Sequence, residues 1–269
     1  MHNFKFKEIY DINDLIEIMS ILRAPDGCPW DIEQSHVSIK KCLIEETYEV
    51  IEAINKNDSE LLKEELGDVL LQVVFHSQIE SESNSFNFND VADGICKKLI
   101  IRHPHIFSDI TVNSADDVIT NWDEIKKKTK GQKTQSQTMD SISRELPALM
   151  RAEKVQRKAA KVGFDWNDVC GALSKLDEEI CELKEAIQQG NQENISDEFG
   201  DVLFSAVNVS RFVNIEPEES LTNATDKFLS RFKIVEQLAA QRDIQISNAS
   251  LEVLNSLWGE AKILINPNH

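Results

Sequence analysis

The same spacing of acidic residues occurs twice in this chain of 269 residues. Each copy holds a Glu-x-x-Glu pair followed by Glu-x-Gly-Asp, and every one of these acidic positions in the second copy lies 133 residues after its counterpart in the first. A constant offset over several positions indicates an internal duplication. We therefore expect two similar modules, residues 1–127 and 142–269, joined by a polar linker at residues 128–141.

Apolar side chains in both modules recur with the period of an α-helix. Only 9 Gly and 6 Pro are present, too few turn-forming residues for a β-protein of this length, and no segment alternates convincingly as a strand would. Short polar breaks at 55–58 and 189–192 join neighbouring helices, which must then run antiparallel. We predict an all-α fold with helices near 11–23, 34–56, 58–82, 90–102, 115–128, 142–161, 168–189, 193–213, 217–242 and 249–264.

The chain carries 47 acidic and 29 basic residues, which gives a net charge of −18. This excess disfavours a nucleic-acid or membrane partner, because both require clustered positive charge. Five cysteines without a Cys-x-x-Cys pair disfavour disulfides and a Cys-rich zinc site. The N-terminal segment lacks the apolar core of a signal peptide, and no apolar stretch approaches the ~20 residues of a membrane span. We therefore expect a cytoplasmic protein.

The two helices on either side of each break bring acidic residues face to face. Glu49 lies eight residues before residue 57 and Glu65 lies eight residues after it, while Glu46 and Asp68 are each eleven residues away. In an antiparallel hairpin, residues at equal distances from the turn lie opposite each other. Four carboxylates should thus converge beside an apolar face in each copy, and the second set is Glu179, Glu182, Glu198 and Asp201.

Four converging carboxylates cannot all remain ionised without a counter-charge. Protons, Lys or Arg side chains, or divalent cations can supply it. An all-oxygen set without histidine suits Mg²⁺ or Mn²⁺, and the helical rise of about 4.5 Å between residues i and i+3 suits two ions ~3.5–4 Å apart. One alternative is a solvated acidic face. The other is a di-iron bundle, which needs Glu-x-x-His on two helices, whereas only the segment from Glu33 to His36 has that form.

Basic and aromatic residues outside the hairpins are candidates for holding a nucleotide. Trp122 and Trp258 could stack on a base, and two pairs of cations at positions i and i+4 could bind phosphate oxygens. The alternatives are packing in the core and ion pairs at the surface. The sequence has neither a Gly-x4-Gly-Lys phosphate loop nor a Gly-x-Gly-x-x-Gly turn. The two cation pairs are Lys98 with Arg102 and Lys227 with Arg231.

Five segments of the chain form a recognisable set. They read LIEETYEV at 43–50, EELGDVL at 64–70, RHPHIF at 102–107, LPALM at 146–150 and VGFDW at 162–166. Together they resemble the bacterial two-copy MazG family of nucleoside triphosphate pyrophosphohydrolases, over nearly the whole chain. The resemblance implies duplicated four-helix modules, a helical bundle and a homodimer. It also implies Mg²⁺-dependent hydrolysis of ribo- and deoxyribonucleoside triphosphates to the monophosphate and pyrophosphate.

The resemblance also assigns roles to individual residues. In family members the second copy usually carries the nucleotide site, so its metal ligands would be the second acidic set, matched in the first copy by Glu46, Glu49, Glu65 and Asp68. Glu178, with its first-copy counterpart Glu45, is the candidate general base. The residues expected to contact the nucleotide are Lys175, Glu178, Asn194, Asp197, Lys227, Arg231, Trp258 and Lys262, with Lys98, Arg102 and Trp122 in the first copy.

The expected mechanism is attack of a metal-activated water on the α-phosphorus, with pyrophosphate leaving in line. Lys227, Arg231 and Lys262 would neutralise charge on the leaving group. Two further interpretations remain open on the sequence. One copy, the first, could be a non-catalytic module that binds a nucleotide or a partner. Alternatively, the enzyme could have a narrower substrate, of the dUTP or phosphoribosyl-ATP type.

Overall fold

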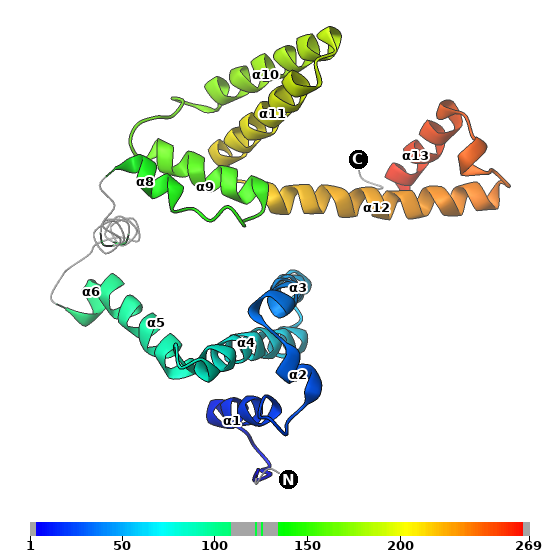
Figure 1. Ribbon diagram of the computed structural model, residues 1–269. Coiled ribbons are helices and arrows are strands. Elements are labelled where there is room, and N and C mark those ends of the chain that lie inside the picture. The colour runs from blue at the N-terminus through cyan, green and yellow to red at the C-terminus, as the bar shows by residue number, and fades with distance from the viewer. Residues whose placement is uncertain (1–3, 109–121, 123–124, 126–133, 266–269) are drawn as a thin grey trace. The chain divides into compact units, whose positions relative to one another are not determined.

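The computed structural model describes residues 4–108, 122, 125 and 134–265 (Figure 1). The chain divides into two compact units, unit 1 (Met1–Lys126) and unit 2 (Lys127–His269). Every regular element in the described ranges is a helix, which confirms the predicted all-α class. The helices of unit 1 are α1 (Ile12–Leu22), α2 (Pro29–Glu33), α3 (His36–Lys56), α4 (Ser59–Glu82), α5 (Phe88–Arg102) and α6 (Pro104–Phe107).

Unit 2 repeats the order of the long helices described in unit 1. In the part of the chain that the structure describes, no helix has the length and apolar character needed to cross a bilayer. The elements of unit 2 are α8 (Gln135–Asp140), α9 (Ala148–Ala160), α10 (Val169–Gln189), α11 (Gln192–Phe212), α12 (Pro217–Gln241), a short 3₁₀ helix (Ile246–Asn248) and α13 (Leu251–Ile265).

The long helices lie close to their predicted positions, but the short helices α2, α6 and α8 were not predicted. Helix α8 occupies residues 135–140, which we had assigned to the linker. Its first turn is closed by a capping box from Thr134, Thr138 is buried, and the Gln135 amide donates a hydrogen bond to the Lys158 carbonyl of α9. These tertiary contacts, rather than an apolar repeat, hold the helix. Most of the helix expected at 115–128 falls outside the described residues.

The turns of the two central hairpins have the same geometry. Asn57 ends α3 with φ of 53° and Gly190 ends α10 with φ of 72°, both in the left-handed region. The next residues, Asp58 and Asn191, cap α4 and α11 with their side-chain oxygens. A left-handed residue followed at once by a capping side chain reverses the chain within two residues. The hairpins α3–α4 and α10–α11 are therefore antiparallel, as predicted, and equivalent in register.

Each unit has its own hydrophobic cluster. In unit 1, helix α1 crosses the α3–α4 hairpin at its open end, where the buried side chains are Met19, Ile39, Val74 and Phe75. Arg23, which follows α1, stabilises this packing through a bidentate ion pair with Glu82 of α4. In unit 2, α9 packs against both α11 and α12, and α12 packs along α13 through Val235, Ala239, Leu257 and Ala261.

A chain of hydrogen bonds crosses the open end of the unit 1 hairpin. His36 Nδ1 lies 2.7 Å from His76 Nδ1, and His36 Nε2 lies 2.7 Å from a carboxylate oxygen of Glu80. His76 Nε2 is buried and has no hydrogen-bond partner among the described residues. Burial, together with the charge of His36, lowers the pKa of His76 below its usual value.

We expect this lowered pKa to make unit 1 sensitive to mild acid. Between the lowered pKa and the ordinary value of about 6.5, the unfolded chain binds more protons than the folded one, so stability falls as the pH falls. His76→Phe removes this group and should flatten the pH dependence below about pH 6.5. Urea unfolding at several pH values, followed by circular dichroism, measures the difference. An undiminished pH dependence in the variant would contradict the assignment.

Candidate functional site

Each central hairpin gathers three carboxylates at one place. In unit 1, one oxygen from each of Glu46, Glu49 and Glu65 lies within 4.8 Å of the other two. In unit 2 the equivalent residues, Glu179, Glu182 and Glu198, meet the same limit. Two glutamates one turn apart on the first helix meet one glutamate from the second, as the distances from the turn predict. We call these groups the first and the second acidic cluster.

The fourth predicted ligand of each copy lies outside its cluster. Asp68 and Asp201 are one turn beyond Glu65 and Glu198 and are not part of either 4.8 Å group. Asp68 is nevertheless near enough for its charge to raise the pKa of Glu46. The structure thus brings together three of the four predicted carboxylates in each copy and leaves the fourth at the margin.

Repulsion within the first acidic cluster is reflected in its protonation. Burial raises the pKa of Glu46, and a hydrogen bond with Glu49 and the charge of Asp68 raise it further. Burial is also the main cause of the raised pKa of Glu65, followed by the charge of Glu49. Carboxylates that resist ionisation in this way bind either a proton or a cation. The first cluster is therefore short of positive charge.

The second acidic cluster contains a cation of its own. Lys175 Nζ lies 2.8 Å from Glu179 and 2.9 Å from Glu178. Glu179 is only 6% exposed, and the pairing with it raises the pKa of Lys175. A hydrogen bond with Glu179, and then burial, raise the pKa of Glu182. At the position equivalent to Lys175, 133 residues earlier, the first copy has Cys42, so the two clusters differ by one positive charge.

The donor set of both clusters fits a divalent cation. All the ligands are carboxylate oxygens from rigid helices, which is the chemistry that Mg²⁺ and Mn²⁺ prefer. Burial and neighbouring carboxylates raise the pKa of Glu46, Glu65 and Glu182, so added positive charge would favour their ionised forms. A cation would supply that charge and leave the carboxylates ionised.

Glu178 and Glu45, the predicted general bases, lie beside the clusters rather than in them. Glu178 is held by Lys175, and Glu45 is held by Lys41 at 2.8 Å. Asn194 and Asp197 lie exposed near the start of α11, before Glu198. The structure therefore places these four residues along the same hairpins as the acidic clusters.

The predicted phosphate and base contacts of unit 2 lie on a different pair of helices. The guanidinium carbon of Arg231 in α12 sits 5.9 Å from the Trp258 ring centre in α13, and Phe228 contacts the same ring at 5.1 Å. Lys227 and Lys262 are exposed on these two helices. Within unit 2, the α12–α13 pair and the α10–α11 hairpin extend from α9 in different directions (Figure 1). This arrangement does not bring Arg231 and Trp258 to the second acidic cluster of the same protomer.

The corresponding residues of unit 1 lie on or near α5. Lys98 and Arg102 are in the C-terminal half of that helix, whose first residue, Phe88, packs against the hydrophobic cluster of unit 1. Trp122 contacts the His103 ring edge-on at 4.9 Å. This contact places Trp122 beside the residue that follows α5.

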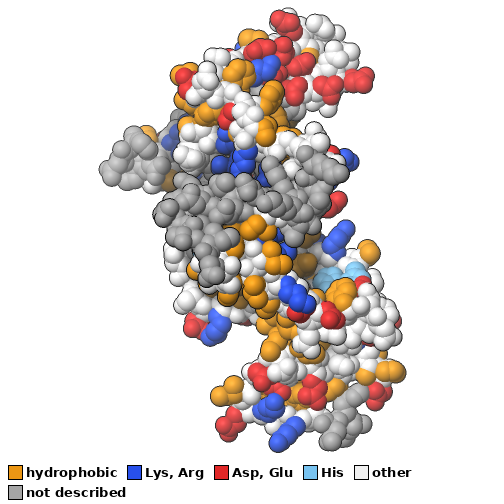
Figure 2. Space-filling model, turned by 90° about the vertical axis from the view of Figure 1, so that its left-hand side faces the viewer, with side chains coloured by type: hydrophobic (Ala, Val, Ile, Leu, Met, Phe, Trp, Pro, Cys, Tyr) orange, Lys and Arg blue, Asp and Glu red, His pale blue; other side chains and the backbone are white. Residues whose placement is uncertain are grey.

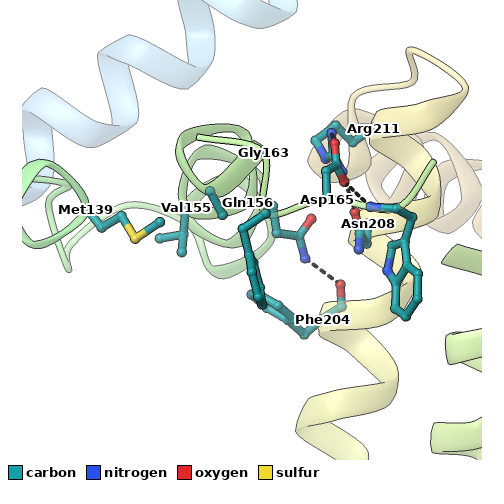
Figure 3. A pocket seen from close by; sticks show the side chains of 11 residues that line it. Met139, Val155, Gln156, Gly163, Asp165, Phe204, Asn208 and Arg211 are labelled. Atoms are coloured by element: carbon teal, nitrogen blue, oxygen red, sulfur yellow. Dashed lines mark hydrogen bonds and ion pairs between the residues drawn. The ribbon is translucent and has the colours of Figure 1, made fainter. Parts of the chain in front are cut away.

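A cavity in unit 2 was missed by the sequence reasoning. It encloses about 480 Å³ between α8, α9, the segment 163–166 and α11 (Figure 3). An ion pair between Arg211 and Asp165 forms part of its wall, with 2.8 Å between Nη1 of Arg211 and a carboxylate oxygen. The VGFDW segment at 162–166 was the available signal, but the sequence alone gave no partner for its aspartate.

Comparison with known proteins assigns the chain to a family. A model of the MazG nucleotide pyrophosphohydrolase domain matches twice, at residues 34–107 and 160–235. These two matches cover more than half of the chain, contain both central hairpins, and confirm the internal duplication. The chain belongs to the MazG family. All eight predicted metal ligands lie inside the matches, whereas Trp258 and Lys262 lie beyond the second one.

Relatives of similar length support the assignment. The nucleoside triphosphate pyrophosphohydrolase/pyrophosphatase MazG of Thermotoga maritima is 45% identical over 249 residues, covering 93% of this chain and 94% of that protein. The nucleoside triphosphate pyrophosphohydrolase of Escherichia coli K12 is 41% identical over 254 residues, covering 93% and 97%. A crystal structure of a MazG-related protein from T. maritima aligns with 43% of this chain and 99% of its own, at 28% identity and a TM-score of 0.38.

We expect Mg²⁺ to stabilise this MazG chain through its acidic clusters. At a concentration about 100 times the dissociation constant, binding to the folded state alone adds about 2.7 kcal/mol, which raises the melting temperature by several degrees. Glu179→Gln should reduce the effect, because it removes a buried ligand of the second cluster. Glu185→Gln, an exposed change one turn beyond Glu182, is the matched control. Scanning calorimetry with Mg²⁺ and with EDTA measures both, and equal shifts in the two variants would exclude the cluster as the binding site.

Proposed function

We propose that this MazG chain hydrolyses ribo- and deoxyribonucleoside triphosphates to the monophosphate and pyrophosphate, in the cytoplasm and with a divalent cation. The observation that carries the proposal is the pair of carboxylate clusters, each with three oxygens within 4.8 Å, on equivalent hairpins. The names of the T. maritima and E. coli relatives agree with this activity. The net charge of −18 favours free nucleotides over nucleic acid or membranes as the partners.

In unit 2, Glu179, Glu182 and Glu198 would hold Mg²⁺, or Mn²⁺ in its place, with Asp201 at the margin. When bound, the ion supplies positive charge for the phosphate oxygens and makes a nearby water more acidic. Glu179 is fixed from the opposite side by Lys175, so the ligand does not have to be ordered when the substrate arrives. Lys175 also offsets one of the carboxylate charges that would otherwise repel a triphosphate.

The remaining roles fall to Glu178, beside the cluster, and to residues of the α12–α13 pair. Glu178, ion-paired with Lys175, accepts the proton of the water that attacks the α-phosphorus. The cations Lys227, Arg231 and Lys262 neutralise the pyrophosphate as it leaves. Trp258 offers a planar surface for the base. Most of the rate enhancement then comes from positioning and from charge, because the chemistry requires no covalent intermediate.

We propose that unit 2 is the catalytic copy and that unit 1 binds a nucleotide or a partner without turnover. Cys42 replaces Lys175 in the first copy, so a triphosphate there would face an acidic cluster with one positive charge fewer. In unit 1, the Glu45 carboxylate is held by Lys41, and Lys41 is largely exposed to water. The difference in fixed charge favours phosphate chemistry at the second cluster.

This assignment predicts unequal effects of equivalent substitutions. Glu179→Gln should lower kcat by about a hundredfold or more, since it removes a carboxylate that would hold the cation at the reacting phosphate. Glu46→Gln should leave kcat within a few fold of wild type. Chromatography of the products over time gives both rates and identifies the products. Release of the nucleoside diphosphate and inorganic phosphate would show that the bond to the γ-phosphate is cleaved instead. Equal losses in the two variants would show that both copies are catalytic.

We further propose a homodimer in which the α12–α13 pair of one protomer completes the second cluster of the other. Within one protomer these helices extend away from the α10–α11 hairpin (Figure 1). Large hydrophobic side chains remain exposed on both, and apolar side chains are scattered over the face seen in Figure 2. Apolar helix faces of this kind are typical of surfaces that a second copy covers. The exposed residues are Leu173, Phe199 and Leu203 on the hairpin and Leu221, Phe228 and Leu229 on α12.

Complementation between two inactive variants tests this arrangement. If the site is shared, a heterodimer of Glu179→Gln and Arg231→Ala has one doubly substituted site and one intact site. The heterodimer, purified with two different affinity tags, should then show about half of the wild-type activity. Each homodimeric variant serves as the inactive control. A heterodimer as inactive as its parents would place both residues in the same protomer's site.

A further inference from the structure

The cavity of unit 2 has mainly apolar walls with a few polar groups. Helix α9 contributes Val155 and Gln156, α11 contributes Phe204, Asn208 and Arg211, and the segment before α10 contributes Trp166 (Figure 3). The Trp166 ring is set against Gly171, where an added Cβ would approach the ring to 3.1 Å. The volume of the cavity, about 480 Å³, falls within the range of small-molecule sites. The wall includes three aromatic side chains, Phe164, Trp166 and Phe204, which suit a flat ligand.

One buried acceptor in this wall is left without a partner. Gln156 is 6% exposed, and its amide nitrogen donates a 2.8 Å hydrogen bond to the Phe204 carbonyl (Figure 3). This bond fixes the amide plane, so the Gln156 side-chain oxygen is held in the cavity wall. That oxygen is buried and accepts no hydrogen bond from any described residue. A buried acceptor of this kind is unfavourable unless a ligand or a water donates to it.

The charged groups of the wall neutralise each other. Arg211 donates to both carboxylate oxygens of Asp165 and, at 2.8 Å, to the side-chain oxygen of Asn208. The bidentate pair lowers the pKa of Asp165, which therefore stays ionised. Arg211 Nε is buried and, among the described residues, finds no acceptor. The wall thus holds one unpaired acceptor, the Gln156 oxygen, and its charged groups neutralise each other, which does not suit a phosphate.

The cavity also lies on a different side of α11 from the second acidic cluster. Glu198 faces α10, where it meets Glu179 and Glu182. Phe204 is six residues further on, about 9 Å along the helix axis, and its carbonyl meets Gln156 of α9. By the helical repeat of about 100° per residue, the two side chains point some 120° apart. We therefore do not expect a single ligand molecule to occupy the cavity and the acidic cluster at the same time.

We propose that this cavity is a second ligand site, which takes the uncharged heterocycle of a nucleobase or nucleoside. A ring N–H would donate to the unpaired Gln156 oxygen, and the aromatic side chains of Trp166 and Phe204 in the wall suit the faces of the ring. Asparagine and glutamine amides recognise base edges by the same pairing of donor and acceptor. The site goes beyond the proposed hydrolysis, because it requires neither the metal nor the triphosphate.

Calorimetry on the full-length protein in EDTA tests the proposal. Purine and pyrimidine nucleosides, and the corresponding free bases, are titrated separately at up to millimolar concentration. We expect at least one of them to bind, and Gln156→Leu to weaken binding by about tenfold or more, because it leaves the ligand N–H unpaired. Gln188→Leu, an exposed change on α10, is the matched control. Glu179→Gln should bind as well as wild type, which separates this site from the acidic cluster.

Val155→Phe provides a second test that keeps the Gln156 hydrogen bond. It fills the cavity and should abolish binding, while a melting curve shows that the protein remains folded. Tighter binding of the nucleoside than of its base would show that the sugar is also held, and equal binding would show that the base alone is recognised. The proposal is overturned if no compound binds, or if Gln156→Leu and Val155→Phe both bind normally. It also fails if Glu179→Gln abolishes binding, since the nucleoside then occupies the acidic cluster.

Discussion

Repulsion among carboxylates is the interaction that this MazG structure is built to withstand. Three glutamates share a space of 4.8 Å in each central hairpin, and their mutual charge opposes the packing that creates it. The hairpins resist it because the turn is specified at both ends, by Asn57 or Gly190 in the left-handed region and by the capping residue that follows. Ala53 and Ala186 are buried at equivalent positions near the turns, where small side chains let the two helices approach closely. The turn geometry and the close helix pairing therefore hold the carboxylates together against their mutual repulsion.

The duplication has kept this framework and changed its charge. Both copies retain the three clustered glutamates, yet Lys175 is present in only one of them. In unit 2 the lysine compensates the charge of Glu179. In unit 1 no lysine holds the equivalent Glu46 in the described residues, and burial raises the pKa of both Glu46 and Glu65. One difference at one helical position, Lys175 against Cys42, therefore gives two hairpins of the same fold a different local charge. Such a change can make two duplicated sites differ in what they bind.

Much of the framework could be predicted from the sequence because it depends on local rules. The helical period placed the long helices, and equal distances from the turn brought Glu49 opposite Glu65 and Glu182 opposite Glu198. The short helix α8 was missed because its stability comes from the buried Thr138 and from a bond to the Lys158 carbonyl, which are contacts between segments. The cavity beside Gln156 was missed for the same reason, since it forms only where α8, α9 and α11 meet. Helical spacing also could not show that Asp68 and Asp201 stay at the margin of the clusters.

The position of α12 and α13 connects the fold to assembly. Arg231 lies against the Trp258 ring, and Trp258 packs on the hydrophobic cluster that joins these two helices, so the pair carries a cation next to an aromatic ring. That pair does not cover the acidic hairpin of its own protomer, which leaves an acidic cluster on one helical pair and cations on another. Both helix pairs also carry exposed leucine and phenylalanine, which is the apolar surface that the proposed twofold dimer would bury. In such a dimer the charge that the second cluster lacks would come from the partner, and the hydrophobic contact that joins the copies would also complete the site.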